Sequence, residues 1–235
     1  TTGVDPISTM TGTAGNDTIN ANPGASNANT FTTLDNIDGG AGTDTMNVNE
    51  IGTVGASAYT LNAAGTVKNV EVLNYTVGSD NVGDAVTADL SNWSGLTTAN
   101  VVISGTDAPL TLMTTKGNVT TASIDGATTS AITDSATKDT LATVSVLNST
   151  GLATLTSDAL TTVNLTASSG GATVVAAAGT RALTVNLNGV TGGTVTDNEA
   201  TSLTVGSTGA KVTATTLTAN KAATVTVNAA VETTI

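Results

Sequence analysis

The chain has 235 residues and a formal net charge of −12, from 18 acidic and 6 basic side chains. This balance argues against nucleic acid as a partner, because phosphate binding needs clustered Lys and Arg, and it argues equally against anionic membrane surfaces. Cysteine and histidine are absent, which excludes disulfides, thiolate metal sites, and Ser-His-Asp or Cys-His catalysis within this chain.

Small apolar side chains must form the core, since aromatic residues make up only 2% of the sequence. Large aromatics usually supply much of the buried area of a compact globule. Rows of Val, Leu and Ile in stacked β-rungs suit this composition, because each repeated unit then covers its neighbour. Helix is disfavoured by the Thr, Val and Gly content. The composition therefore predicts an all-β fold.

The segment before Lys68, the first basic residue, carries six acidic side chains and no base. The opening TTGVDPISTM lacks the basic and apolar regions of a signal peptide. No apolar run reaches the length of a membrane span. Because the chain starts and stops abruptly, we expect a fragment or a processed product of a longer protein.

Two glycine-rich stretches in this acidic segment share one pattern. Residues 39–46 (GGAGTDTM) match G-G-x-G-x-D-x-U at every defined position, where U is a large apolar residue, and residues 12–19 (GTAGNDTI) lack only the second glycine. This nonapeptide is the calcium-binding repeat of RTX proteins. Glycine permits a tight turn with crowded backbone carbonyls, and the Asp adds an anionic oxygen, a combination that calcium prefers.

The two copies share a nonapeptide phase, with units starting at positions 12, 21, 30 and 39. The sixth position of these units is Asp17, Ser26, Asp35 and Asp44. If two nonapeptides form one turn of a roll, Asp17 and Asp35 lie on the same side, one turn apart. Two carboxylates at about 5 Å repel by roughly 3 kcal/mol at an effective dielectric near 20, so we expect this roll to close only around cations. Residues 21–33 also fit a loop, in which case the phase is accidental there.

From about residue 50, alternating apolar and polar residues predict short strands without the glycine motif. Apolar pairs recur with a period typical of solenoids, and single apolar positions lie midway between them, which describes a β-solenoid or a flattened sandwich of stacked rungs. We expect an RTX-like calcium-binding roll over residues 1–49 and a Thr/Val-rich β-solenoid over residues 50–235, with rungs of about 20 residues. The pairs are Val144/Val146, Val163/Leu165, Val185/Leu187, Leu203/Val205 and Val225/Val227, and the midway positions are Leu155, Val175, Val195 and Leu217.

The predicted side-chain ligands of calcium are Asp17, Asp35 and Asp44. The alternative is that they are ordinary turn-forming residues, but a second, complete copy of the motif in a segment without bases favours calcium. Asp38 and Asn16 are further candidate ligands.

Two later acidic turns are weaker candidates for calcium, with solvated strand ends as an equal alternative: Asp134 in one, and Asp197 with Glu199 in the other. Trp93 is predicted to fill a satellite core rather than to stack on a sugar. A paired-carboxylate glycosidase would need aromatic platforms and bases, and the chain has one Trp and one Arg. We therefore expect no enzyme activity.

On these residues the chain resembles the RTX-type surface-layer (S-layer) proteins of Gram-negative bacteria. The resemblance rests on residues 12–19 and 39–46 and continues through residues 67–74 (VKNVEVLN), which are similar to a segment that follows the calcium roll in that family. Weaker similarity extends over residues 131–135, 157–165, 183–189 and 196–199.

The resemblance implies type I export, folding on contact with extracellular calcium, and assembly into a two-dimensional lattice. It also implies several Ca²⁺ ions, held by the side chains of Asp17, Asp35 and Asp44 and by backbone carbonyls of Gly12, Ala14, Gly39 and Ala41. The sequence departs from the family pattern at Thr13 and Ser26, and only two good repeats occur, which leaves the number of ions open.

The sequence thus predicts a secreted structural protein of the bacterial cell surface that self-associates, without direct membrane insertion. Another part of the protein could bind cell-surface polysaccharide. One alternative is a calcium-stiffened adhesin or ice-binding solenoid, although Thr154/Thr156, Thr194/Thr196 and Thr224/Thr226 are unevenly spaced for one ice-binding face. Another is the calcium roll of a larger secreted enzyme, against which the long solenoid after residue 50 argues.

Overall fold

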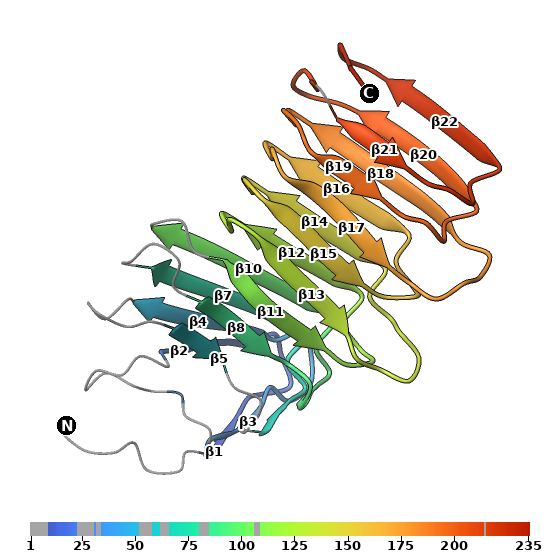
Figure 1. The fold of residues 1–235 in the computed structure, drawn as a ribbon. Helices are drawn as coiled ribbons and strands as arrows, with labels where there is room; N and C mark the ends of the chain where they lie inside the picture. The colour runs from blue at the N-terminus through green and yellow to red at the C-terminus, as the bar shows by residue number, and fades with distance from the viewer. Residues whose placement is uncertain are drawn as a thin grey trace.

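The protein is an all-β solenoid, which confirms the predicted fold class. The computed structural model describes residues 9–22, 31, 34–51, 58–61, 66–79, 85–105, 109–213 and 215–235. Within these residues the chain forms β-strands and no helix. The strands pair in parallel between successive turns of the solenoid (Figure 1), as expected when each turn repeats the path of the one before it.

A ten-stranded parallel sheet runs the whole length of the described solenoid. It contains one strand from every turn, and its residues alternate between the core and the solvent. Its strands, in spatial order, are β2 (Thr18–Ala21), β4 (Thr45–Ile51), β7 (Val72–Ser79), β10 (Thr98–Gly105), β12 (Thr121–Asp125), β14 (Thr143–Leu147), β16 (Thr162–Thr166), β18 (Ala182–Asn188), β20 (Ser202–Ser207) and β22 (Thr224–Ala229).

An eight-stranded sheet forms the opposite wall of the solenoid. Its strands are β5 (Ala58–Leu61), β8 (Ala85–Asp89), β11 (Leu110–Thr115), β13 (Ser130–Asp134), β15 (Leu152–Thr156), β17 (Gly171–Val175), β19 (Thr194–Thr196) and β21 (Thr216–Thr218). A third sheet of four short strands lies only beside the first turns: β1 (Thr9–Thr11), β3 (Asn36–Asp38), β6 (Thr66–Lys68) and β9 (Trp93–Ser94).

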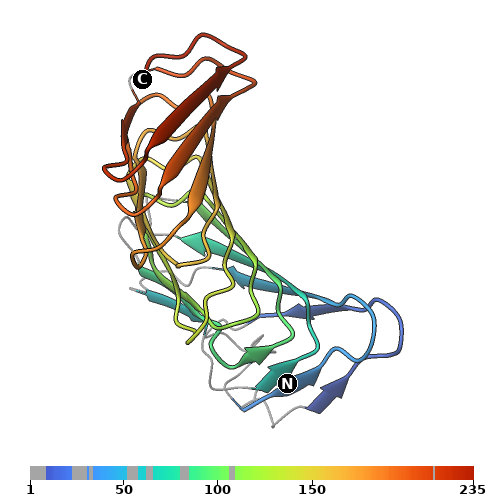
Figure 2. The same ribbon diagram turned by 90° about the vertical axis from the view of Figure 1, so that its right-hand side faces the viewer.

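The turns are wide near the N-terminus and narrower after it. Asn20 and Asn47 occupy equivalent places in neighbouring early turns at a sequence separation of 27, whereas Ser145 and Asn164 do so in later turns at a separation of 19. The third sheet accounts for the extra length, because it adds a strand to each early turn. Figure 2 shows this change of width and a curve along the stack. The ten-stranded sheet continues across the boundary predicted at residue 50, because β4 pairs directly with β7.

The core is one continuous cluster of Val, Leu, Ile, Met and Ala side chains between the sheets. Aromatic residues are confined to its wide end, where Phe31 and Trp93 make an edge-to-face contact with ring centroids 6.3 Å apart. Trp93 is 3% exposed, in agreement with its predicted role as a core residue. Among the described residues, no helix is long and apolar enough to cross a membrane.

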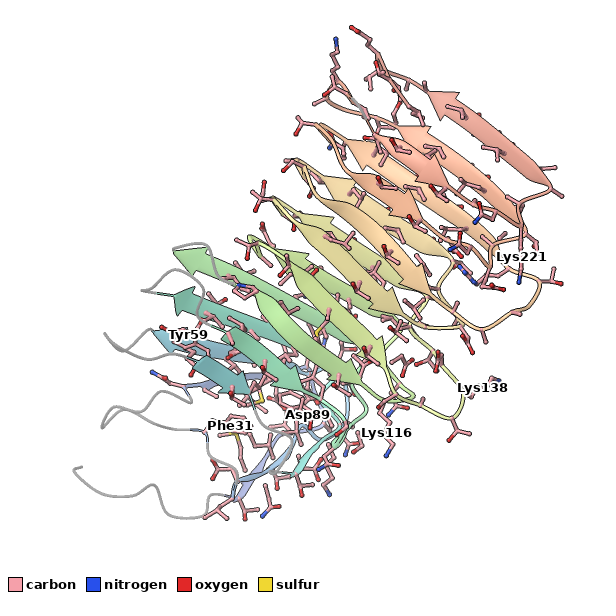
Figure 3. All side chains as sticks on the ribbon, in the orientation of Figure 1. Phe31, Tyr59, Asp89, Lys116, Lys138 and Lys221 are labelled. Atoms are coloured by element: carbon pink, nitrogen blue, oxygen red, sulfur yellow. The ribbon has the colours of Figure 1, made fainter. Side chains whose placement is uncertain are left out.

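An asparagine ladder runs along the outward face of the ten-stranded sheet, whose side chains Figure 3 draws as sticks. Side-chain amides of successive turns donate to one another at 2.8–3.1 Å, and serines replace asparagine in two central turns. Each bond ties a turn to its predecessor, as in stacked cross-β structures. The ladder consists of Asn20, Asn47, Asn74, Asn100, Ser123, Ser145, Asn164 and Asn186, and the register continues it to Gly206 and Asn228.

Candidate metal centre

The two glycine motifs form the same corner of two consecutive turns. Residues 12–17 connect β1 to β2, and residues 39–44 connect β3 to β4. Because Thr11 aligns with Asp38 and Thr18 with Thr45, the first motif stacks directly on the second.

The prediction that two nonapeptides make one turn is therefore wrong. One turn here corresponds to a sequence separation of 27, which is three nonapeptides rather than two. Asp17 consequently neighbours Asp44 rather than Asp35. The predicted unit starting at position 21, which includes Ser26, lies largely outside the described residues.

Three carboxylates stack along this corner. The backbone N–H of Asp17 donates to Oδ1 of Asp44 at 2.7 Å, and the N–H of Asp44 donates to Oε2 of Glu71 at 2.7 Å. We call Asp17, Asp44 and Glu71 the acidic column. In the described part of the chain, none of the ion pairs involves a member of this column, so its charges are adjacent and lack a paired base.

Glu71 is a functional candidate that the sequence analysis did not select, although it lies in the VKNVEVLN segment. Its corner contains only Asn69, Val70 and Glu71 between β6 and β7. The longer Glu side chain reaches across this shorter corner to the N–H of Asp44. The signal that could have found it is the constant sequence separation of 27 from Asp17 to Asp44 and from Asp44 to Glu71.

The first glycine of each motif leaves room for a carbonyl and a carboxylate oxygen. A Cβ at Gly39 would lie 1.8 Å from the carbonyl oxygen of Asn69 and 2.6 Å from Oδ2 of Asp44. The same holds one turn earlier, where a Cβ at Gly12 would lie 1.9 Å from the carbonyl oxygen of Gly39 and 2.8 Å from Oδ2 of Asp17. Glycine is required at both positions because a side chain would occupy this space. The corner thus repeats one pairing of backbone and carboxylate oxygens.

Asp44 is the buried member of the column. Its side chain is 0% exposed, and Oδ2 is a buried oxygen without a hydrogen-bond partner among the described residues. Oδ2 of Asp17 differs, since it accepts hydrogen bonds from the backbone N–H and the hydroxyl of Thr13 at 2.6 and 3.0 Å. A buried carboxylate oxygen without a donor is costly, so Asp44 marks the point where a cation would contribute most.

The other predicted ligands of the first turns have structural partners. Asn16 accepts a bond from the N–H of Thr43 at 2.8 Å and links the two motifs. Asp38 forms an ion pair with Lys68 at 2.9 Å and accepts a bond from the amide of Asn69 at 2.8 Å. These partners lower the pKa of Asp38, with the bond from Lys68 as the largest cause. Asp35 is buried before β3, outside the acidic column.

The residues whose backbone carbonyls were expected to bind calcium also lie in the two stacked corners. The N–H of Gly12 donates to the carbonyl of Asp38, and the N–H of Ala41 donates to the carbonyl of Thr13. Ala14 and Ala41 occupy the exposed outer part of their corners. The carbonyl oxygen of Gly39 lies beside Gly12, where an added Cβ would meet both this oxygen and Oδ2 of Asp17.

The later acidic turns are separate from this corner. Asp134 ends β13 and accepts backbone bonds from Thr140 and Leu141 at 2.7 and 3.1 Å, so its carboxylate closes the turn into β14. Asp197 follows β19 and binds the guanidinium of Arg181 at 2.6 and 2.7 Å. Glu199 pairs with Lys221 at 2.5 Å. The structure does not bring these three carboxylates to the acidic column.

The donor set of the corner suits a hard cation. Among the described residues, no three acidic side chains converge closely enough to hold a metal by themselves, so backbone carbonyls would have to complete a coordination shell. Calcium takes six to eight oxygens, carboxylate and carbonyl alike, at about 2.3–2.6 Å. The carbonyl oxygen of Asn69 and Oδ2 of Asp44 both lie beside Gly39, where each would meet an added Cβ, so the corner offers one oxygen of each kind.

No protein-family model, curated protein or solved structure matches this chain. The functional argument therefore depends on the corner itself and on the solenoid that carries it.

Proposed function

We propose that this protein is a structural component of a calcium-dependent bacterial S-layer, which folds and assembles on binding extracellular Ca²⁺. The observation that carries the proposal is Asp44, whose carboxylate is fully buried within the acidic column and has one oxygen without a donor among the described residues. The resemblance of the two glycine motifs to RTX calcium repeats supports the same cation.

The energetics favour a divalent ion at this corner. Carboxylates in adjacent turns, about 5 Å apart, repel by roughly 3 kcal/mol per pair at an effective dielectric near 20. Backbone N–H groups offset part of this repulsion, since they donate to Asp44 and Glu71 at 2.7 Å. Calcium would offset the rest and would supply the missing partner of Asp44. Metal binding then couples directly to the folding of these turns.

A structural role is supported by the remaining architecture. The asparagine side chains on the outward face of the ten-stranded sheet bind one another, and the walls enclose a continuous hydrophobic stack. Calcium is scarce in the cytoplasm and abundant outside, so folding would wait until export. The partners would be further copies of the chain, with anchoring to surface polysaccharide supplied by another part of the protein.

The test is urea unfolding followed by circular dichroism, in calcium and in excess chelator. A site filled at a hundred times its Kd stabilises the native state by about 2.7 kcal/mol. In Asp44→Asn we expect this calcium-dependent gain to fall by more than half. In chelator the variant should be at least as stable as the wild type, because the substitution removes a buried charge from the column.

Asp158→Asn is the matched control. Asp158 lies in an exposed turn and accepts a bond from the N–H of Ala177, far along the chain from the acidic column, so its variant should keep the full response to calcium. Equal unfolding curves for the wild type in calcium and in chelator would overturn the calcium proposal. Electron microscopy of calcium-treated material tests the lattice, and ordered sheets are the expected result.

The ice-binding alternative receives less support from the register of the threonines. Thr154 aligns through Thr173 with Thr196, so the pair Thr194/Thr196 is shifted by two positions relative to Thr154/Thr156. The pair Thr224/Thr226 lies in the other sheet, in β22. These pairs therefore form no single Thr-x-Thr array.

A further inference from the structure

The two glycine motifs are similar in sequence, yet their aspartates have different surroundings. Residues 12–17 form the first corner and residues 39–44 the second. In the first corner, Oδ2 of Asp17 accepts two hydrogen bonds. In the second corner, Oδ2 of Asp44 is buried and has no hydrogen-bond partner among the described residues. Because a buried carboxylate oxygen needs a donor or a cation, the two corners differ in their need for an ion.

Thr13 supplies both donors to Asp17. Its backbone N–H lies 2.6 Å from Oδ2 of Asp17, and its hydroxyl lies 3.0 Å from the same oxygen. The corresponding residue of the second corner is Gly40, which has no hydroxyl. Thr13 is also the position at which the first motif departs from the RTX pattern. The residue that breaks the motif is therefore the residue that satisfies the aspartate.

The second corner has no equivalent donor for its aspartate. Gly40 has a φ of +100°, and a Cβ there would lie 2.1 Å from the carbonyl oxygen of Thr13, so this position requires glycine. The backbone N–H of Gly40 donates instead to Oδ1 of Asp38 at 3.2 Å. Thr11 aligns with Asp38 but carries no carboxylate. The N–H of Thr13 is therefore left to bind Asp17.

Asp38 is held beside the second corner by two further contacts. Lys68 forms an ion pair with its Oδ2 at 2.9 Å, and the side-chain amide of Asn69 donates to its Oδ1 at 2.8 Å. The backbone carbonyl oxygen of Asn69 lies beside Gly39, where an added Cβ would meet both this oxygen and Oδ2 of Asp44. Asp38 therefore connects the residue that offers the carbonyl to the corner that contains the buried aspartate.

From this comparison we propose that the two stacked corners bind one Ca²⁺, at Asp44, and that Thr13 replaces the ion at Asp17. Oδ2 of Asp44 and the carbonyl oxygen of Asn69 are ligands of this ion. Asp38 is a positioning residue, because it draws a competing N–H donor away from Asp44. The inference deepens the proposed function and rests on it, since it names the aspartate that binds calcium and the residue that limits the number of ions.

Equilibrium dialysis against saturating calcium tests the assignment by counting the bound ions relative to the wild type. Asp44→Asn should bind one ion fewer. Asp17→Asn is the matched control, since it makes the same change at the same motif position one turn earlier, and it should bind as many ions as the wild type. Circular dichroism in calcium checks that both variants fold.

A double variant tests the role of Thr13 through a gain of binding. Thr11→Asp with Thr13→Gly gives the first corner the residue types found at positions 38 and 40 of the second. The hydroxyl is removed and the added carboxylate can accept the N–H of residue 13, so Asp17 loses both donors and one more ion should bind. Thr9→Asp with Thr13→Gly adds the same charge two residues earlier on β1, where Thr9 aligns with Asn36. This control should bind as many ions as the wild type.

Four results would overturn the inference: a folded Asp17→Asn that loses an ion, an Asp44→Asn that keeps all of them, a folded Thr11→Asp/Thr13→Gly variant that gains none, or an equal gain in the Thr9→Asp/Thr13→Gly control. Each of these results leaves a protein that binds calcium, so the proposed function survives them. A wild type that binds no calcium rejects the proposed function, and this inference with it. The count for the wild type thus separates the two failures.

Discussion

Glu50 is an acidic side chain on the core-facing side of a strand. It follows Met46 and Val48 in the alternation of β4 and accepts a hydrogen bond from the hydroxyl of Tyr75, which is fully buried. Removal from water raises the pKa of Glu50, and the bond from Tyr75 offsets only part of this effect. Burial and the neighbouring carboxylate likewise raise the pKa of Tyr75, so Tyr75 remains a donor at any physiological pH.

Glu50→Gln should stabilise the protein at neutral pH. The folded state raises the pKa of this carboxyl above its ordinary value of 4.5, so the folded state binds the proton more tightly than the unfolded state. The free energy of unfolding therefore falls as the pH rises from the unfolded pKa through the folded pKa. Gln keeps an acceptor for Tyr75 but carries no charge. The difference in unfolding free energy between variant and wild type should vanish below the unfolded pKa and grow with pH. Urea titrations at several pH values measure it.

The exposed Glu232→Gln supplies the control for this pH series. Glu232 pairs with Lys211 at the surface, where its side chain is 70% exposed, and such pairs contribute little. Its variant should show a small, nearly constant difference across the same pH range. A Glu50→Gln difference that does not change with pH would contradict the assignment of Glu50 as a partly buried charge.

At the residue level the sequence predicted part of the candidate site. Asp17 and Asp44 could be predicted because the glycine motif marks them, and the structure stacks them one turn apart. Glu71 could not be predicted from a motif, since its corner lacks glycine and its partner depends on the length of the turn. Asp35 was expected beside Asp17 because two nonapeptides were assumed to make one turn, whereas the turn contains three. The strand of the third sheet, which no local pattern indicates, lengthens the turn and changes the neighbour.

Among the elements, the corner before β18 contains the one buried ion pair of the described residues. The guanidinium of Arg181 binds both carboxylate oxygens of Asp197 and the carbonyl of Leu160. Asp197 also accepts bonds from the N–H groups of Glu199 and Ala200 at 3.0 Å. Arg181 therefore ties three successive turns of the solenoid at one corner.

Arg181→Met should destabilise the protein by about 3–5 kcal/mol, because it leaves Asp197 buried without its partner. Lys221→Met removes an exposed base that pairs with Glu199, and its cost should stay within about 1 kcal/mol. Unfolding in urea, with both variants in parallel, measures the contrast. Equal costs would show that the Arg181 pair behaves like a surface pair.

Strands were the most predictable elements. The apolar pairs from Val144/Val146 to Val225/Val227 all lie in the ten-stranded sheet, and Leu155, Val175, Val195 and Leu217 all lie in the opposite sheet, as alternation predicts. The prediction for the core-facing residue of β17 was wrong, because Val174 is buried and Val175 is exposed. Gly171 has a φ of +113° and sits directly before Ala172, and the strand enters the core in the phase of Ala172 and Val174.

On the scale of the whole molecule, each turn contacts only its neighbours, so stability is a sum of local terms and nearest-neighbour contacts. The terms differ along the chain. The first three turns contain the acidic column and, by the calcium proposal, depend on an external ion. The later turns share the apolar rows and the asparagine ladder and add the Arg181 corner, and their stacked carboxylates Asp139 and Asp158 form a pair in an exposed turn. Removal of calcium should therefore act from one end of the molecule.

Hydrogen exchange read out by mass spectrometry should resolve this gradient. In chelator we expect amides of β2 and β4 to exchange much faster than in calcium, while those of β16 and β18 keep most of their protection. The reason is that opening the first turns exposes only one new interface to water, and the remaining stack keeps its other contacts. Asp44→Asn should reduce the difference in exchange rate between calcium and chelator for the amides of β2 and β4. The exchange rates of β16 and β18 should stay unchanged. Uniform loss of protection along the whole solenoid would instead mean that the turns unfold as one unit and that the acidic column controls all of them.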